Sequence, residues 1–157
     1  MKSDYLNIYN NLIKLTRNKL LYRNNINNES FSDRLIIFLF HFAFFLKVYK
    51  NKSNKEEFQK LYDFIFYQIE LSIREVGYGD STVNKKMKEY INLLYKIIDK
   101  VELWEKLNFN EKIDFFSKFL DVTYKNTFYI EYFNKYSIYL TKKSFNYFTK
   151  DVISHKF

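Results

Sequence analysis

The sequence has 157 residues but no cysteine, no proline, only two glycines and only two histidines. Without cysteine, the chain has no disulfide, no thiolate metal ligand and no thiol nucleophile. The histidines, His41 and His155, are far apart in sequence, and neither belongs to the His-x-x-x-His or Glu-x-x-His spacing typical of metal sites. We therefore expect no metal and no other cofactor.

The scarcity of glycine singles out one stretch, Ile73–Lys88, because it holds both glycines, Gly77 and Gly79. With no proline present, this is where the backbone can turn most sharply. Asp80 and Ser81 follow as candidates to cap a helix that begins there. We expect Gly77, Gly79 and Asp80 to form the turn, and a larger residue at Gly79 to be strained if its φ is positive.

Apolar and aromatic residues are abundant, at 47% and 22% of the chain. The apolar residues recur at helical spacing in every segment, and neither sustained alternation nor a hairpin signal is present. The length suits one domain, residues 1–157. We predict an all-α, single-domain bundle of five to seven helices, with the Gly-x-Gly turn between the third and the fourth.

The expected helices differ in how they begin. Ser30 or Ser32 can cap the second helix, Asn54 followed by Glu57 resembles a capping box for the third, and Asn110 is the candidate cap of the fifth. An asparagine-rich loop is expected at 23–29, a frayed tail at 149–157, and helices at 5–18, 33–49, 55–76, 81–107, from 110 onward, and one or two over 127–148.

The most apolar run, Leu35–Leu46, is shorter than the ~20 residues that a membrane-spanning helix needs. Its apolar residues occupy nearly every face, which is typical of a helix in the centre of a bundle. His41 in this run is then a hydrogen-bonded core histidine rather than a base or a ligand. A helix that dips into a membrane surface is the alternative.

The formal net charge of +8 favours an acidic partner: RNA, a ribosome surface, an anionic membrane leaflet or an acidic protein. Lys85 and Lys86 would lie at a helix N-terminus, where cations oppose the helix dipole. Their alternative interpretation is an ordinary solvated helix face. Gly77-Tyr78-Gly79 follows a helix rather than a strand and lacks the pattern of a phosphate-binding loop. We expect no catalytic residues and therefore no enzyme.

The run Ile73-Arg74-Glu75-Val76-Gly77-Tyr78-Gly79-Asp80, followed by Val83, Lys85 and Lys86, resembles a motif of the ubiquinol–cytochrome c chaperone family. A second match is Ser32-Asp33-Arg34-Leu35 with Phe40-His41, and a weaker one is Arg17 followed by Tyr22. The sequence departs from the family pattern at Leu35, which replaces an aromatic residue, and at Tyr95-Lys96-Ile97, where the family has Tyr-Gly-Arg.

The resemblance implies a non-catalytic, all-helical assembly chaperone for the respiratory cytochrome bc complex. Such proteins bind newly made cytochrome b, in some cases near the ribosomal exit, and need no small-molecule substrate. The absence of a mitochondrial leader suggests a bacterial version in the cytoplasm or at the cytoplasmic face of the inner membrane. The expected partners are cytochrome b or another subunit of the complex, and also the ribosome or the membrane surface.

We assign partner binding to Arg34, Arg74, Lys85 and Lys86, of which the last three can converge on one edge beside the turn. An internal ion pair between Arg74 and Asp80 is an equally good interpretation of that arginine. Two other functions stay open: a basic RNA- or ribosome-associated module, and a peripheral membrane protein that uses the apolar run at 35–46 or the aromatic C-terminal helices.

Overall fold

The computed structural model describes residues 2–22, 31–52, 54–120 and 127–150, and within these ranges it contains helices and no strand. The all-α prediction is confirmed, and seven α-helices fall within the expected five to seven. The predicted loop at 23–29, Ser30 and residues 151–157 lie outside the described residues. The α-helices are α1 (Lys2–Thr16), α2 (Phe31–Tyr49), α3 (Lys55–Glu75), α4 (Asp80–Glu102), α5 (Phe109–Phe119), α6 (Thr127–Thr141) and α7 (Phe145–Lys150).

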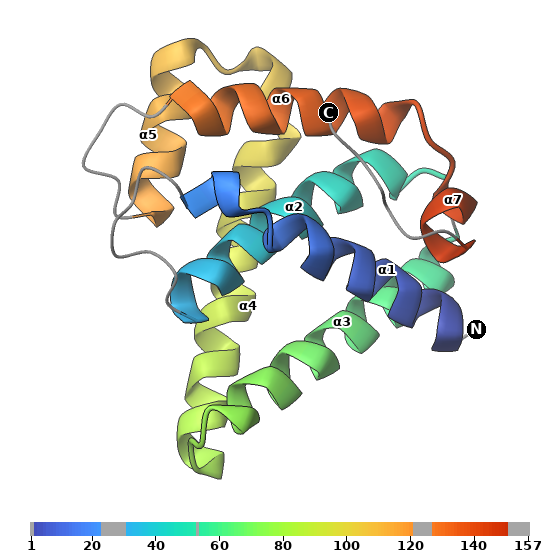
Figure 1. Ribbon diagram of the computed structural model, residues 1–157, viewed down its shortest axis with the longest axis vertical. Coiled ribbons are helices and arrows are strands. Elements are labelled where there is room, and N and C mark those ends of the chain that lie inside the picture. Colours follow the sequence, from blue (N-terminus) through green and yellow to red (C-terminus); the bar gives the residue numbers. More distant parts are fainter. Residues whose placement is uncertain (1, 23–30, 53, 121–126, 151–157) are drawn as a thin grey trace.

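Helix α2 is the centre of the molecule, and α1, α4 and α6 pack against it (Figure 1). Its apolar residues are spread around the whole helix, so each face needs a neighbour that covers it. Leu39, Phe40, Phe42 and Phe44 are all 0% exposed. The expectation of a buried core helix is confirmed, and no helix among the described residues has the length and apolarity needed to cross a bilayer.

Helices α3 and α4 form the arm of the molecule that carries both glycines. They diverge from the short connection at residues 76–79, which lies at the lower end of the molecule in Figure 1. Helix α3 runs back beneath α1, and α4 runs up against α2. Val76 and Tyr78 in this connection are 49% and 41% exposed, so a partner can reach their side chains.

The caps of α3 and α5 show how local sequence sets the helix starts. The Asn54 side chain accepts a hydrogen bond of 2.7 Å from the Glu57 backbone N–H, as the sequence predicted. The cap of α5 is Asn108 instead of the predicted Asn110, because Asn108 and Glu111 form a reciprocal capping box. Asn110 is the second residue of the helix.

The end of α4 also differs from the prediction, since the helix stops at Glu102 rather than at Leu107. A short 3₁₀ turn, Trp104–Lys106, follows it. This turn directs Trp104 into the core, where its indole Nε1–H donates a 2.8 Å hydrogen bond to Asn134 of α6. The periodicity of α4 alone does not reveal this change at the end of the helix.

The last helix, α7, is held against the first. The side-chain amides of Asn7 and Asn11 in α1 donate hydrogen bonds to the backbone carbonyls of Thr149 and Phe148, at 2.7 and 3.0 Å. Thr149 and Lys150 are therefore helical, although the sequence placed them in a frayed tail. The contact joins residues at the two ends of the chain, which local sequence patterns do not predict.

Candidate functional site

The two glycines before α4 have different backbone conformations. Gly77 has φ of +106°, a left-handed value that side chains disfavour. Gly79 has φ −74° and ψ 166°, which any residue adopts, and it is the N-cap of α4. The expected strain therefore belongs to Gly77 rather than Gly79. Asp80 is the first residue of α4 and not its cap, and the cap makes no side-chain hydrogen bond.

Arg74, on the last turn of α3, pairs with two carboxylates. One guanidinium nitrogen forms a hydrogen-bonded ion pair with Asp80, and another lies 3.5 Å from Glu70. The hydrogen bond that Arg74 donates to Asp80 raises the pKa of Arg74 further above its ordinary value. Arg74 was expected either to form an internal ion pair with Asp80 or to bind a partner. The structure contains the ion pair, which joins α3 to the start of α4. A contact with a partner stays a prediction.

The lysines after the turn lie on its exposed side. Lys86 is half-buried, and its Nζ lies 4.8 Å from the centroid of the Tyr78 ring, as in a cation–π contact. Lys85 is exposed, and no described residue pairs with it. We call the surface formed by Arg74, Tyr78, Lys85 and Lys86 the turn surface. It combines three cations with an aromatic ring that is 41% exposed.

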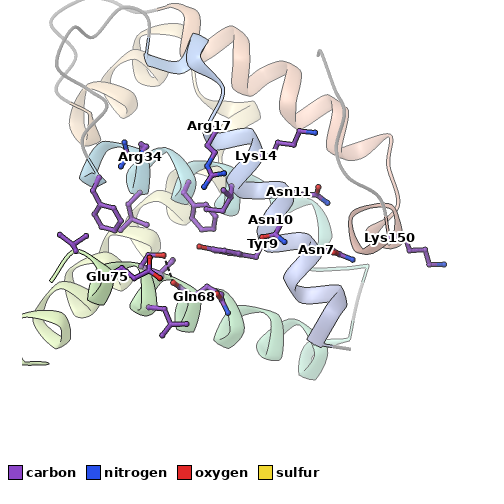
Figure 2. A pocket seen from close by; sticks show the side chains of 18 residues that line it. Asn7, Tyr9, Asn10, Asn11, Lys14, Arg17, Arg34, Gln68, Glu75 and Lys150 are labelled. Carbon is purple, nitrogen blue, oxygen red and sulfur yellow. Dashed lines mark hydrogen bonds between the residues drawn. The ribbon is translucent and has the colours of Figure 1, made fainter. Parts of the chain in front are cut away.

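Arg34, the fourth predicted partner-binding residue, lies apart from the lysines, in a groove bounded by α1, α2 and α3 (Figure 2). The groove has a volume of about 910 Å³, near the upper end of the ~300–1,000 Å³ usual for ligand clefts. Its lining ends at Glu75 and Val76, which directly precede Gly77, so the groove reaches the base of the turn. We call this cleft the α1–α3 groove; the side chains that define it here are those of Asn10, Arg17, Arg34, Gln68, Ser72 and Glu75.

One wall of this groove was missed as a site by sequence reasoning, although a signal for it exists. Asn7, Asn10 and Lys14 on α1 and Arg17 directly after it follow one another at intervals of three and four residues, so they form one polar stripe. In the sequence, Arg17 matches a family position, but the stripe resembles an ordinary solvated helix face. Its place opposite α3 follows only from the tertiary structure.

His41 is 0% exposed, which confirms the predicted burial. Its ring nitrogens have partners: Nδ1 lies 2.8 Å from the Ile37 carbonyl oxygen and Nε2 lies 2.7 Å from the Tyr132 hydroxyl. Since a carbonyl only accepts, Nδ1 carries the hydrogen of that bond. Among the described residues, no group of three or more His, Asp or Glu side chains is arranged to hold a metal ion.

Comparison with known proteins gives one match. The model of the family described as Ubiquinol-cytochrome C chaperone matches residues 26–103. This segment includes α2, α3, the turn and α4, and it contains Arg34, Arg74, Lys85 and Lys86. Searches of curated proteins and of solved structures found no significant match.

Proposed function

The chain belongs to the ubiquinol–cytochrome c chaperone family, and from this we propose that it is a non-catalytic assembly chaperone of a bacterial cytochrome bc complex. Its client is cytochrome b before that subunit enters the complex. The observation that carries the proposal is the family match over residues 26–103. It acts in the cytoplasm, including at the cytoplasmic face of the inner membrane, where a new membrane subunit emerges.

The turn surface is the proposed contact with the client. Lys85 has no described partner, and Lys86 keeps its ammonium group over an exposed ring, so both cations remain accessible. Arg74 contributes in a different way, because its ion pair with Asp80 fixes the start of α4, and α4 carries the lysines. A positive surface of this kind steers an acidic loop or helix end of a client toward the chaperone.

Exchange of Lys85 and Lys86 for Gln is expected to leave the free energy of unfolding within about 0.5 kcal/mol of the parent. Two small effects account for this: Lys85 and Lys86 lie in the second turn of α4, where the unfavourable effect of the helix dipole on cations is weak, and the contact of Lys86 with Tyr78 is favourable. The same change is expected to reduce capture of cytochrome b about tenfold, which corresponds to about 1.4 kcal/mol of binding free energy. Thermal melts and pull-downs measure the two effects.

The matched control is Lys96→Gln with Lys100→Gln, which removes two exposed lysines from the same helix at a distance from the turn. This control is expected to melt and to capture the client as the parent does. If both double variants lose capture equally, net charge rather than the turn surface governs binding. If the Lys85 and Lys86 variant melts early, these lysines stabilise the fold.

A further inference from the structure

The α1–α3 groove has an uneven distribution of charge. Arg17, directly after α1, and Arg34 of α2 line it, and Glu75 is the one carboxylate among its lining residues. Figure 2 shows Arg17 pointing from the end of α1 into the space between α1 and α3, whereas Lys14 and Lys150 point outward. The groove thus has a cationic part beside α1 and α2, and an acidic part on α3.

Arg17 is the strongest sign of a ligand in this groove. Within the described residues, its guanidinium group has neither an ion-pair nor a hydrogen-bond partner, although the side chain points into a cleft. A guanidinium carries five N–H donors in a planar fork that matches a carboxylate in bidentate geometry. Arg17 is exposed, so these donors are open to an anion, and a carboxylate fits their shape.

The lining also includes amide side chains that suit a peptide backbone. Asn10 of α1 and Gln68 of α3 present side-chain amides on opposite walls, each able to donate and to accept hydrogen bonds. Apolar side chains line the groove as well: Leu35, Phe38 and Ile69 are 7%, 2% and 2% exposed, whereas Leu71 and Val76 are 37% and 49% exposed. The exposed pair can pack against an apolar side chain of a bound segment.

We propose that the α1–α3 groove binds an acidic peptide segment of a protein partner. The carboxylates of the segment contact Arg17 and Arg34, and its backbone hydrogen-bonds to Asn10 and Gln68. Glu75 repels a carboxylate at its end of the groove and so orients the segment. This inference refines the proposed function, since it specifies what a client presents beside its contact with the turn surface.

The test uses a fluorescein-labelled 12-residue peptide of Asp, Glu, Ser and Gly, and a companion in which Asn and Gln replace the acids. Fluorescence anisotropy is measured with the full chain, with Arg17→Gln/Arg34→Gln, and with Lys100→Gln/Lys142→Gln as the control. Both double variants lose two positive charges, but neither Lys100 nor Lys142 lines the groove. We expect the arginine variant to bind the acidic peptide at least tenfold more weakly, and the control less than threefold.

A third variant, Asn10→Ala/Gln68→Ala, keeps every charge and removes the two amides. This variant is expected to bind the acidic peptide severalfold more weakly, because the backbone of the bound segment loses its hydrogen-bond partners. Thermal melts of all variants establish that each is folded at the temperature of the assay. An equal loss of binding in the arginine and lysine variants would overturn the proposal, since attraction by net charge alone predicts that result.

Vesicles of phosphatidylcholine with and without phosphatidylglycerol test the rival ligand. If anionic vesicles bind in an Arg17- and Arg34-dependent manner and the acidic peptide does not, the groove binds lipid phosphate and the proposal is wrong. The peptide contains no cytochrome b sequence, so its failure would leave the capture of cytochrome b untouched. Conversely, if the parent chain binds the acidic peptide but does not capture cytochrome b, the proposed function is wrong and the assignment of the groove as a peptide site stands.

Discussion

Replacement of Phe133 by Ala is expected to lower the free energy of unfolding by about 3–5 kcal/mol, a large part of the ~5–15 kcal/mol that stabilises a typical domain. Phe133 lies on α6 and is 0% exposed. Its ring centroid is 5.2 Å from that of Phe44, 5.6 Å from that of Phe116 and 5.8 Å from that of Phe40. Truncation leaves a cavity between α2, α5 and α6, and urea unfolding followed by circular dichroism measures the loss.

Phe109→Ala is the matched control, because it removes the same ring from a position that is 52% exposed. We expect its free energy of unfolding to stay within about 0.5 kcal/mol of the parent, as at other surface positions. If Phe133→Ala unfolded at the same urea concentration as the parent, the packing of α6 on α2 described here would be wrong.

Replacement of Gly77 by Val is expected to lower the free energy of unfolding by about 1–3 kcal/mol. The cause is backbone conformation: φ is +106°, and a β-branched residue is strongly disfavoured there. Space is not the cause, since a Cβ at Gly77 would meet no atom within 4 Å. Thermal melts and urea unfolding measure the effect.

Gly79→Ser, at the second glycine of the turn, is expected to raise the free energy of unfolding rather than lower it. Gly79 has an ordinary extended conformation at the N-cap of α4, where no side chain satisfies the first N–H groups. A serine hydroxyl accepts from such a group, so we expect a gain of a few tenths of a kcal/mol. If Gly79→Ser were as destabilising as Gly77→Val, the roles assigned to the two glycines would be incorrect.

Features that depend on local pattern could be predicted from the sequence. The apolar residues on every face of 33–49 indicated a central helix, and α2 is buried with His41 at its middle. The spacing between Asn54 and Glu57 gave the correct start of α3. These features need only the helical repeat and the hydrogen-bonding capacity of nearby side chains.

The sequence also contained signals that were read incorrectly. Asn108 and Glu111 have the spacing of a capping box, yet Asn110 was chosen as the cap of α5. Of two glycines in one turn, the sequence alone does not reveal which has the positive φ. Asp80 was interpreted as a cap because of its residue type, whereas in the structure its carboxylate pairs with Arg74.

The α1–α3 groove depends on tertiary structure and was beyond the reach of sequence patterns. Arg17 and Glu75 are separated in sequence by α2 and nearly all of α3, and they line one cleft because α3 packs against α1. The same packing separates Arg34 from Lys85 and Lys86, which share a family segment but lie on different surfaces. The predicted partner-binding residues therefore form two surfaces, one in the groove and one at the turn.

The most direct test of the central proposal is co-purification of the tagged chain with cytochrome b, from cells in which assembly of the bc complex is under way. Mass spectrometry of the captured material is compared with that from untagged cells. The proposal predicts enrichment of cytochrome b without the remaining subunits in their complex ratio, since a chaperone leaves before assembly is complete. Capture of the whole complex, or of RNA or anionic lipid without cytochrome b, would contradict it.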